Sequence, residues 1–272
     1  MLKTTLLIAT VGLAAVILSF PGLCFAQEQP APGKQVLQKI ELPESTSDWN
    51  WKEEGVSTLG RIRSLDESQK ETVSYWLFLP EEESAKTEAG FPLLLFLHGA
   101  GERGSNPEAV KMHGPPKLVE TEKGKSWPFI TVSPQCPDGM HWSPMQLLRL
   151  LDSVEAQYPV DRSRVYVTGL SMGGFGTYML IDSAPERFAA AMPLCGGYDP
   201  EKAEHMTQTP IWAFHGDADG AVPIEMDRAI VEAIQKAGGN IQFTVYPGVQ
   251  HDCWTQTYNN PDVYAWLLKQ HR

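Results

Sequence analysis

Positive charge and cysteine are both scarce in this sequence. Its 272 residues include 22 lysines and arginines against 33 acidic residues, a formal net charge of −11, and only four cysteines. A nucleic-acid-binding protein needs a clustered basic surface, so we expect no nucleic-acid partner. The sequence also lacks an HExxH motif and any Cys/His spacing typical of zinc sites. We therefore expect no metal and no organic cofactor.

The N-terminal residues have the pattern of a secretion signal. Lys3 precedes an apolar run over residues 6–20, and small residues follow up to Ala26; this order is typical of a signal peptide. We expect cleavage of residues 1–26, a secreted or periplasmic protein, and no stable membrane insertion afterwards. Two alternatives stay open: a membrane anchor, for which the run is short, and a lipoprotein modified at Cys24, where Leu23 is larger than such signals carry.

The remainder is long enough for one large domain with a complete core. Residues 27–50 are rich in Pro, Gln, Glu and Ser without periodicity, so we expect an irregular lead-in before a domain over 51–272. Three cysteines follow the signal: Cys136, Cys195 and Cys253. In an oxidising compartment two of them could pair, but the sequence does not show which two. The oligomeric state is equally open.

Short apolar runs alternate with helical patterns along the domain. Strands are predicted at residues 56–63, 72–79, 93–97, 129–132, 165–168, 188–194, 211–214 and 241–246. From residue 93 onward these runs resemble strands buried on both faces. Helices are predicted from Ser143–Pro144, and over 224–236 and 262–269. Strands that alternate with helices along the chain predict an α/β fold, a mostly parallel sheet with helices on both faces.

The segment VYVTGLSMGGFG, residues 165–176, places a serine between a strand and a glycine-rich helix. A phosphate-binding loop would need a lysine where Phe175 stands, and a dinucleotide-binding loop would need a different glycine spacing. Gly169, Ser171 and Gly173 instead fit GxSxG, the nucleophile elbow. In that turn a strained backbone exposes the serine hydroxyl, and glycines flank it because larger residues would collide. Ser171 is therefore the candidate nucleophile.

A serine nucleophile needs a base, and in this fold the chain order is serine, acid, histidine. His251 follows the last predicted strand and is the candidate base; His215, before a glycine at a strand end, has a structural interpretation. The acid should follow strand 211–214, where Asp217 and Asp219 both lie. We favour Asp219, interpret Asp217 as a turn residue, and discount Asp252 because it adjoins the base.

An acyl-transfer site also needs backbone donors for the oxyanion. One is expected from Met172, directly after the nucleophile at a helix start. The other is expected from the loop HGAGERG, residues 98–104, where Ala100 is the first choice and Gly101 the alternative. His98, at the start of this loop, is interpreted as structural.

The motifs LHGAGERG, GLSMGGFGTY, FHGDADGAVP and GVQHDCW resemble those of the α/β-hydrolase superfamily. The resemblance runs from about residue 72 onward. More narrowly, the motifs resemble those of secreted carboxylesterases grouped with phospholipase/carboxylesterase, polyhydroxybutyrate-depolymerase-like and feruloyl-esterase-like proteins. It implies a Ser171–Asp219–His251 triad that hydrolyses esters through an acyl-enzyme. Dienelactone hydrolases are similar in layout but carry cysteine at the elbow, so Ser171 argues against their chemistry.

The segment between residues 194 and 209 is too short for a large lid, so an open site is expected. This favours short acyl groups, or soluble carbohydrate and phenolic esters such as acetyl and feruloyl esters. Trp142 and Trp254 are candidate substrate-binding residues, and Glu102 with Arg103 either binds a substrate carboxylate or is an exposed loop pair. A prolyl-oligopeptidase-like serine peptidase is the alternative enzyme, although no room exists upstream for its gating domain. A non-catalytic binding protein on the same scaffold is the distant alternative.

Overall fold

A computed structural model describes residues 30–42, 71–81 and 85–272 of the chain. An eight-stranded sheet runs through it in the order β1-β2-β4-β3-β5-β6-β7-β8. The strands are β1 Gln35–Leu42, β2 Glu71–Phe78, β3 Phe91–Leu97, β4 Ile130–Pro134, β5 Val160–Leu170, β6 Ala190–Leu194, β7 Ile211–Gly216 and β8 Ile241–Tyr246. β2 pairs antiparallel with β1 and β4, and every pair from β4 through β3 to β8 is parallel.

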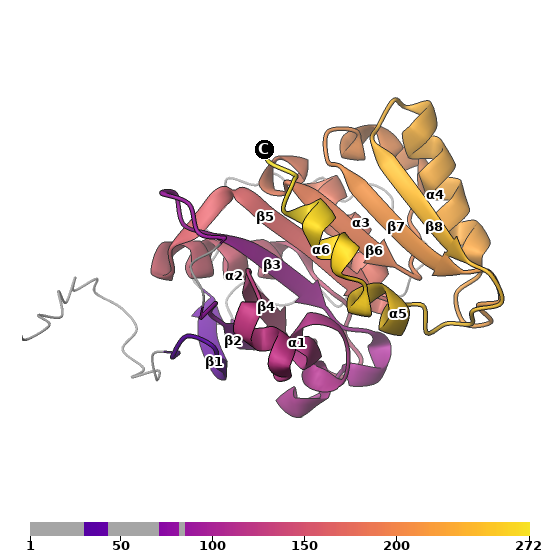
Figure 1. Cartoon of the computed structure of the whole chain (residues 1–272). Helices are drawn as coiled ribbons and strands as arrows, with labels where there is room; N and C mark the ends of the chain where they lie inside the picture. The colour runs from indigo at the N-terminus through magenta and orange to yellow at the C-terminus, as the bar shows by residue number, and fades with distance from the viewer. Residues whose placement is uncertain (1–29, 43–70, 82–84) are drawn as a thin grey trace, which may run out of the picture.

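Helices cover both faces of the sheet (Figure 1). The α-helices are α1 Gly114–Leu118, α2 Pro144–Gln157, α3 Met172–Ser183, α4 Ile224–Lys236, α5 Trp254–Asn259 and α6 Pro261–Leu267. Short 3₁₀ helices are η1 Ala100–Glu102, η2 Pro107–Met112, η3 Glu122–Ser126, η4 Pro185–Arg187 and η5 Pro200–Met206. Helices α2, α3 and α4 pack on one face, and α1, α5 and α6 on the other. This is the α/β-hydrolase fold that the sequence predicted.

The central strands are apolar throughout because both of their faces are buried. In β3, Leu93, Leu95 and Leu97 belong to the core under α2 and α3, whereas Leu94 and Phe96 belong to the core under α1 and α6. Successive side chains of a strand point to opposite faces, so a continuous apolar run serves two cores at once. The strands predicted from such runs are confirmed, although β6 begins at Ala190 rather than at residue 188.

Helix α2 begins where its sequence signals place it. The Ser143 hydroxyl accepts a hydrogen bond from the backbone N–H of Gln146 at 3.5 Å, and Pro144 occupies the first helical position. Proline is tolerated there because its missing N–H has no partner in a first turn. The buried face then repeats through Leu147, Leu151 and Val154.

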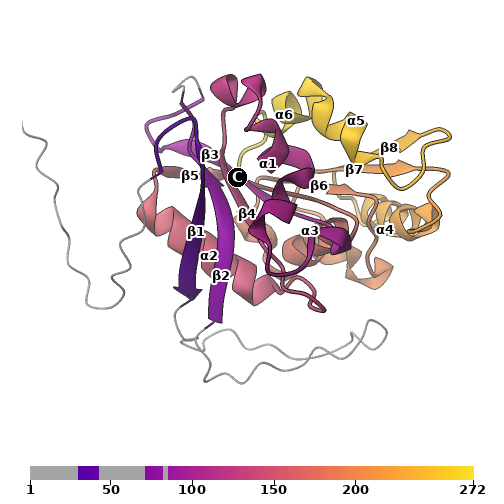
Figure 2. The same ribbon diagram turned by 90° about the horizontal axis from the view of Figure 1, so that it is seen from below.

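The N-terminal part of the sheet corrects the predicted lead-in. Residues 35–42, placed in an irregular segment over 27–50, form β1 and pair along their whole length with β2. Figure 2 shows this pair at one edge of the sheet. The core therefore extends upstream of the boundary predicted at residue 51. The strand predicted over 56–63 lies outside the described residues, as do residues 1–26. In the part of the chain that is described, no helix has the length and apolarity to cross a membrane.

Candidate active site

Ser171 stands at a sharp bend between β5 and α3. Its backbone has φ 54° and ψ −117°, a region that costs a non-glycine residue conformational energy. The flanking glycines make the bend possible. A Cβ on Gly169 would lie 2.4 Å from the carbonyl oxygen of Gly173, and a Cβ on Gly173 would lie 1.9 Å from that of Leu97. Strand end and helix start are therefore in backbone contact, as the elbow prediction requires.

The two later glycines let α3 pack closely on its neighbours. A Cβ on Gly174 would lie 2.4 Å from the carbonyl oxygen of Leu194 at the end of β6. A Cβ on Gly176 would lie 2.8 Å from Cδ1 of Trp142. Glycine in a helix costs up to about 1 kcal/mol relative to alanine. Here the missing side chains allow α3 to approach β6 and Trp142 closely, and this contact holds the N-terminus of α3 under Ser171.

Three side chains from three strand ends form one hydrogen-bonded chain. The Ser171 hydroxyl faces Nε2 of His251 at 2.9 Å, and Nδ1 of His251 faces Oδ2 of Asp219 at 2.7 Å. Ser171 follows β5, Asp219 follows β7 and His251 follows β8. The carboxyl ends of parallel strands lie at the same edge of a sheet, where sites of this architecture gather. The structure thus brings together the three residues predicted from the sequence.

The environment of Asp219 favours its ionised form. Its side chain is 0% exposed, and Oδ1 accepts hydrogen bonds from the backbone N–H groups of Ala221 and Val222 at 2.8 and 2.9 Å. Burial opposes the charge, but the hydrogen bonds from His251 and from these two N–H groups outweigh it and lower the pKa of Asp219. A carboxylate held in this way orients the His251 ring with its proton on Nδ1 and leaves Nε2 to accept from Ser171.

The rejected carboxylates have local partners. Asp217 is exposed and accepts from the backbone N–H of Gly248 at 2.6 Å, so it braces the turn after β8. Asp252 is exposed and accepts from the backbone N–H and hydroxyl of Thr255, both at 2.9 Å. The carboxylate that is hydrogen-bonded to His251 is Asp219, in agreement with the preference for it.

Both expected backbone donors lie at helix starts. Met172 is the first residue of α3, and Ala100 is the first residue of η1. The first N–H groups of a helix have no intrahelical acceptor, so either N–H suits an oxyanion. The N–H of Ser171 itself donates to the carbonyl oxygen of Leu194 at 3.0 Å.

Glu102 and Arg103 brace the loop that carries Ala100, and the burial of Glu102 corrects the interpretation of an exposed loop pair. Glu102 is 8% exposed, and its Oε2 accepts from the N–H of Gly99 at 2.8 Å. Arg103 donates to the carbonyl oxygens of Ala100 and Met140, both at 3.1 Å. The two residues are therefore not an exposed loop pair.

His98 has the expected structural role. It is 1% exposed; Nδ1 lies 2.7 Å from the carbonyl oxygen of Gly99, and Nε2 accepts from the N–H of Cys136 at 3.0 Å. One acceptor and one donor fix a neutral ring with its proton on Nδ1. Burial lowers the pKa of His98 to about 4.

The two tryptophans have different surroundings. Trp142 is 5% exposed, donates from Nε1 to the carbonyl oxygen of His98 at 3.2 Å and packs edge-on against the His98 ring. It is a core residue, so its assignment to substrate binding is wrong. Trp254 is half-buried; its ring lies edge-on to His251 with centroids 5.2 Å apart, and 5.5 Å from that of His113. Of the two, only Trp254 adjoins the triad.

The three cysteines of the described chain are free and buried. Cys195 lies beneath the elbow, because its Sγ faces the N–H of Ser171 at 3.3 Å. Burial raises the pKa of the Cys195 thiol well above its ordinary value, and contact with Cys253 raises it further. No disulfide therefore joins any two of these three cysteines, the pairing that the sequence left open.

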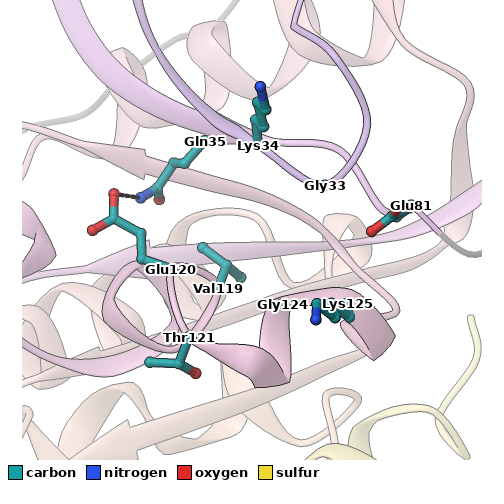
Figure 3. Close-up of a pocket in the computed structure, with 9 residues that line it drawn as sticks. All are labelled: Gly33, Lys34, Gln35, Glu81, Val119, Glu120, Thr121, Gly124 and Lys125. Atoms are coloured by element: carbon teal, nitrogen blue, oxygen red, sulfur yellow. Dashed lines mark hydrogen bonds between the residues drawn. The ribbon is translucent and has the colours of Figure 1, made fainter.

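A separate open cavity of about 410 Å³ lies near the start of β1 (Figure 3). The lining includes Lys34 and Gln35 from the β1 side and Glu120 and Lys125 from the region of η3, and Gln35 reaches across to donate to Glu120 at 3.2 Å. Its lining includes no residue of the Ser171 site. β1 and β8 are the opposite edge strands of the sheet. This cavity is therefore distinct from the candidate active site.

Fold and site together define the class: an α/β-hydrolase fold with a Ser–His–Asp constellation on its elbow. A sequence profile of the Dienelactone hydrolase family matches residues 143–264. A thermostable esterase of known structure is 32% identical and superposes with a TM-score of 0.68, over 76% of this chain and 61% of that one. These similarities confirm the resemblance drawn from the motifs.

Two relatives are similar over part of the chain. Poly(3-hydroxyalkanoate) depolymerase C of Paucimonas lemoignei is 32% identical over 126 residues, 40% of this chain and 28% of the relative. A bifunctional acetylxylan esterase/xylanase of Neocallimastix patriciarum is 29% identical over 135 residues, 47% of this chain and 19% of the relative. The chain thus spans less than a third of either relative.

Proposed function

We propose that this protein hydrolyses carboxylic esters with Ser171 as the nucleophile. The observation that carries the proposal is the hydrogen-bonded chain Ser171–His251–Asp219 at an elbow where the serine backbone is strained. The esterase and depolymerase relatives support the same chemistry. Since a serine hydroxyl is a weak nucleophile without an adjacent base, this geometry supplies what an ester hydrolase needs.

Acylation follows from the positions of the atoms. Ser171 Oγ attacks the ester carbonyl carbon while His251 Nε2 takes its proton, and the oxyanion accepts hydrogen bonds from the N–H groups of Met172 and Ala100. The imidazolium then gives that proton to the departing alkoxide, so the C–O bond breaks and the alcohol leaves. Asp219 stabilises the positive ring while it exists.

Deacylation repeats these steps with water. His251 takes a proton from a water molecule, whose oxygen attacks the acyl carbon. The second tetrahedral intermediate collapses as His251 returns the proton to Ser171 Oγ. The carboxylic acid is released, and every proton taken by the ring is given back within the cycle.

The proposed substrates are short-chain esters, or acetyl and feruloyl esters of carbohydrates and phenols. The connection from β6 to β7 supports an open site, because its only regular element is η5, Pro200–Met206. The half-buried Trp254 beside His251 offers an aromatic face on which a sugar or phenolic ring can pack. A relative named as an acetylxylan esterase is consistent with this class.

A panel of p-nitrophenyl esters from acetate to octanoate tests the proposal. We expect kcat/KM to be highest for the short acyl chains and to fall roughly 10³-fold or more in Ser171→Ala for every ester. Ser105→Ala, which changes an exposed serine directly after the loop of residues 98–104, is the matched control and should retain wild-type rates. Equal rates in wild type and Ser171→Ala would refute the assignment of the nucleophile.

We also propose that residues 1–26 direct export, on the sequence pattern alone. N-terminal sequencing of the protein recovered outside the cytoplasm should begin near residue 27. Recovery of the uncleaved chain in the cytoplasm alone would contradict this.

A further inference from the structure

A second buried histidine lies against the acid of the triad. His215, in β7, is 0% exposed, and its Nε2 lies 3.3 Å from Oδ2 of Asp219. That oxygen is the one that faces Nδ1 of His251. The sequence pattern indicates a structural role for His215 and does not connect it with the acid.

The other partners of His215 are also acceptors. Its Nε2 lies 3.0 Å from the carbonyl oxygen of Val222, and its Nδ1 lies 2.8 Å from Oδ2 of Asp227 in the first turn of α4. The remaining oxygen of Asp227 accepts from the Tyr178 hydroxyl at 2.6 Å. Asp227 and Tyr178 are both 0% exposed.

The partners of a histidine ring define its protons. His98 faces one acceptor and one N–H donor, so a single ring proton satisfies it. At His215 both ring nitrogens face acceptors, so both must donate, and a ring that donates twice is an imidazolium. Burial opposes this charge, but the hydrogen bond and negative charge of Asp227, the Val222 carbonyl and the charge of Asp219 outweigh it, and the pKa of His215 is raised.

We propose that His215 is a buried imidazolium that positions Asp219 and shares its positive charge with that carboxylate, while Asp227 and Tyr178 hold the ring in place. His215 is a positioning residue, since it reaches the reacting atoms only through Asp219 and His251. The inference rests on the proposed function, because it assigns His215 a part in tuning the proposed triad.

The charged groups around His215 set the sign of the effect. Asp227 meets the ring at Nδ1, and Asp219 meets it at Nε2. Tyr178 lies beyond Asp227, whereas His251 and the Cys195 thiol lie beyond Asp219. A positive charge beside Asp219 weakens the hold of this carboxylate on a protonated His251. Without this positive charge, His251 keeps its proton to higher pH, and the acid limb of the activity profile shifts to higher pH.

Asp227→Asn tests this without removing the histidine. The amide oxygen can still accept from Tyr178, while the amide nitrogen donates to Nδ1 of His215, so the ring needs only its Nε2 proton and becomes neutral. We expect the acid-limb midpoint of kcat/KM to rise by at least about half a pH unit. At a pH below the midpoint this corresponds to a loss of roughly threefold, with KM unchanged because the cluster does not touch substrate.

The matched control is Asp161→Asn. Asp161 and Arg164 form another buried ion pair, with Nε and Oδ2 2.8 Å apart and both side chains 7% exposed. This substitution removes a buried carboxylate elsewhere, so it should lower stability and leave the acid limb in place. An equal shift in both variants would overturn the proposal, because general destabilisation would then explain it.

Nitrogen-15 NMR of the histidine rings makes the test independent of turnover. In the wild type we expect both nitrogens of His215 to carry protons at neutral pH while His98 carries one. In Asp227→Asn, His215 should carry one proton and His251 should lose its proton at higher pH. A singly protonated His215 in the wild type overturns the proposal even if no variant folds. A doubly protonated His215 in a protein without esterase activity would refute the proposed function and leave the charge assignment standing.

Discussion

At the scale of single residues, the partners of a side chain decide its protonation. His98 is neutral because Cys136 donates to one nitrogen and the other donates to a carbonyl group. In the unfolded chain the same ring would titrate near its ordinary value of 6.5, whereas in the fold burial lowers the pKa of His98 to about 4. Between these two pH values the ring therefore binds a proton in the unfolded state but not in the folded state.

This difference predicts an acid-sensitive fold. The contribution of His98 is complete above about pH 6.5 and is lost as the pH falls toward 4, so the free energy of unfolding should decrease by about 2 kcal/mol between pH 7 and pH 5. Urea unfolding at both values measures it. The stability contribution of His215 has the opposite sign. Because its pKa in the folded protein is raised, this contribution is complete below the ordinary pKa of 6.5 and is lost only as the pH rises above that value.

His98→Gln is the control for that measurement. It removes the titrating ring, so its own loss of stability between pH 7 and pH 5 should be less than about 0.5 kcal/mol. A wild-type protein whose unfolding free energy stays flat over this interval would contradict a buried neutral His98.

At the scale of elements, the elbow depends on backbone contacts that leave no room for a side chain. Gly173, the second residue of α3, lies directly beneath the end of β3, and the contact is with the main-chain carbonyl of Leu97. A flexible side chain could move aside, but this carbonyl belongs to a central strand paired on both sides. The contact therefore links the position of α3 to the register of the sheet.

Gly173→Ala should destabilise the protein by at least about 3 kcal/mol or prevent its folding, because a Cβ would meet the Leu97 oxygen at 1.9 Å. Gly220→Ala is the matched control. No atom lies within 4 Å of its added Cβ, so a change below about 1 kcal/mol is expected. Thermal unfolding compares the two. Comparable stability of Gly173→Ala and wild type would mean that helix and strand are not in such close contact.

At the scale of the whole molecule, the sequence predicted what depends on local pattern. Apolar runs revealed the central strands because both faces of these strands are buried, and GxSxG followed by an acid and a histidine identified Ser171, Asp219 and His251. The order of these residues is informative because parallel strands deliver their carboxyl ends to one edge.

Features that depend on distant partners were not predictable in the same way. β1 has no strong strand pattern, since it is an edge strand completed by pairing with β2. Tryptophan is a residue type that often binds ring-shaped ligands, but the ring of Trp142 fills the space above Gly176. The contact of His215 with Asp227 joins a strand to a helix, and only the tertiary packing makes it. An aspartate at a buried position of a predicted amphipathic helix was the one signal that could have suggested it.

The measurement that tests the central claim most directly is acyl-enzyme trapping. The protein is mixed with p-nitrophenyl acetate, quenched in acid within the first turnovers, digested and analysed by mass spectrometry. We predict one acetyl group on the peptide that carries Ser171, and none in Ser171→Ala. Ester hydrolysis by the wild type with no acyl group on Ser171, and the same rate in Ser171→Ala, would contradict the nucleophile and with it the proposed mechanism.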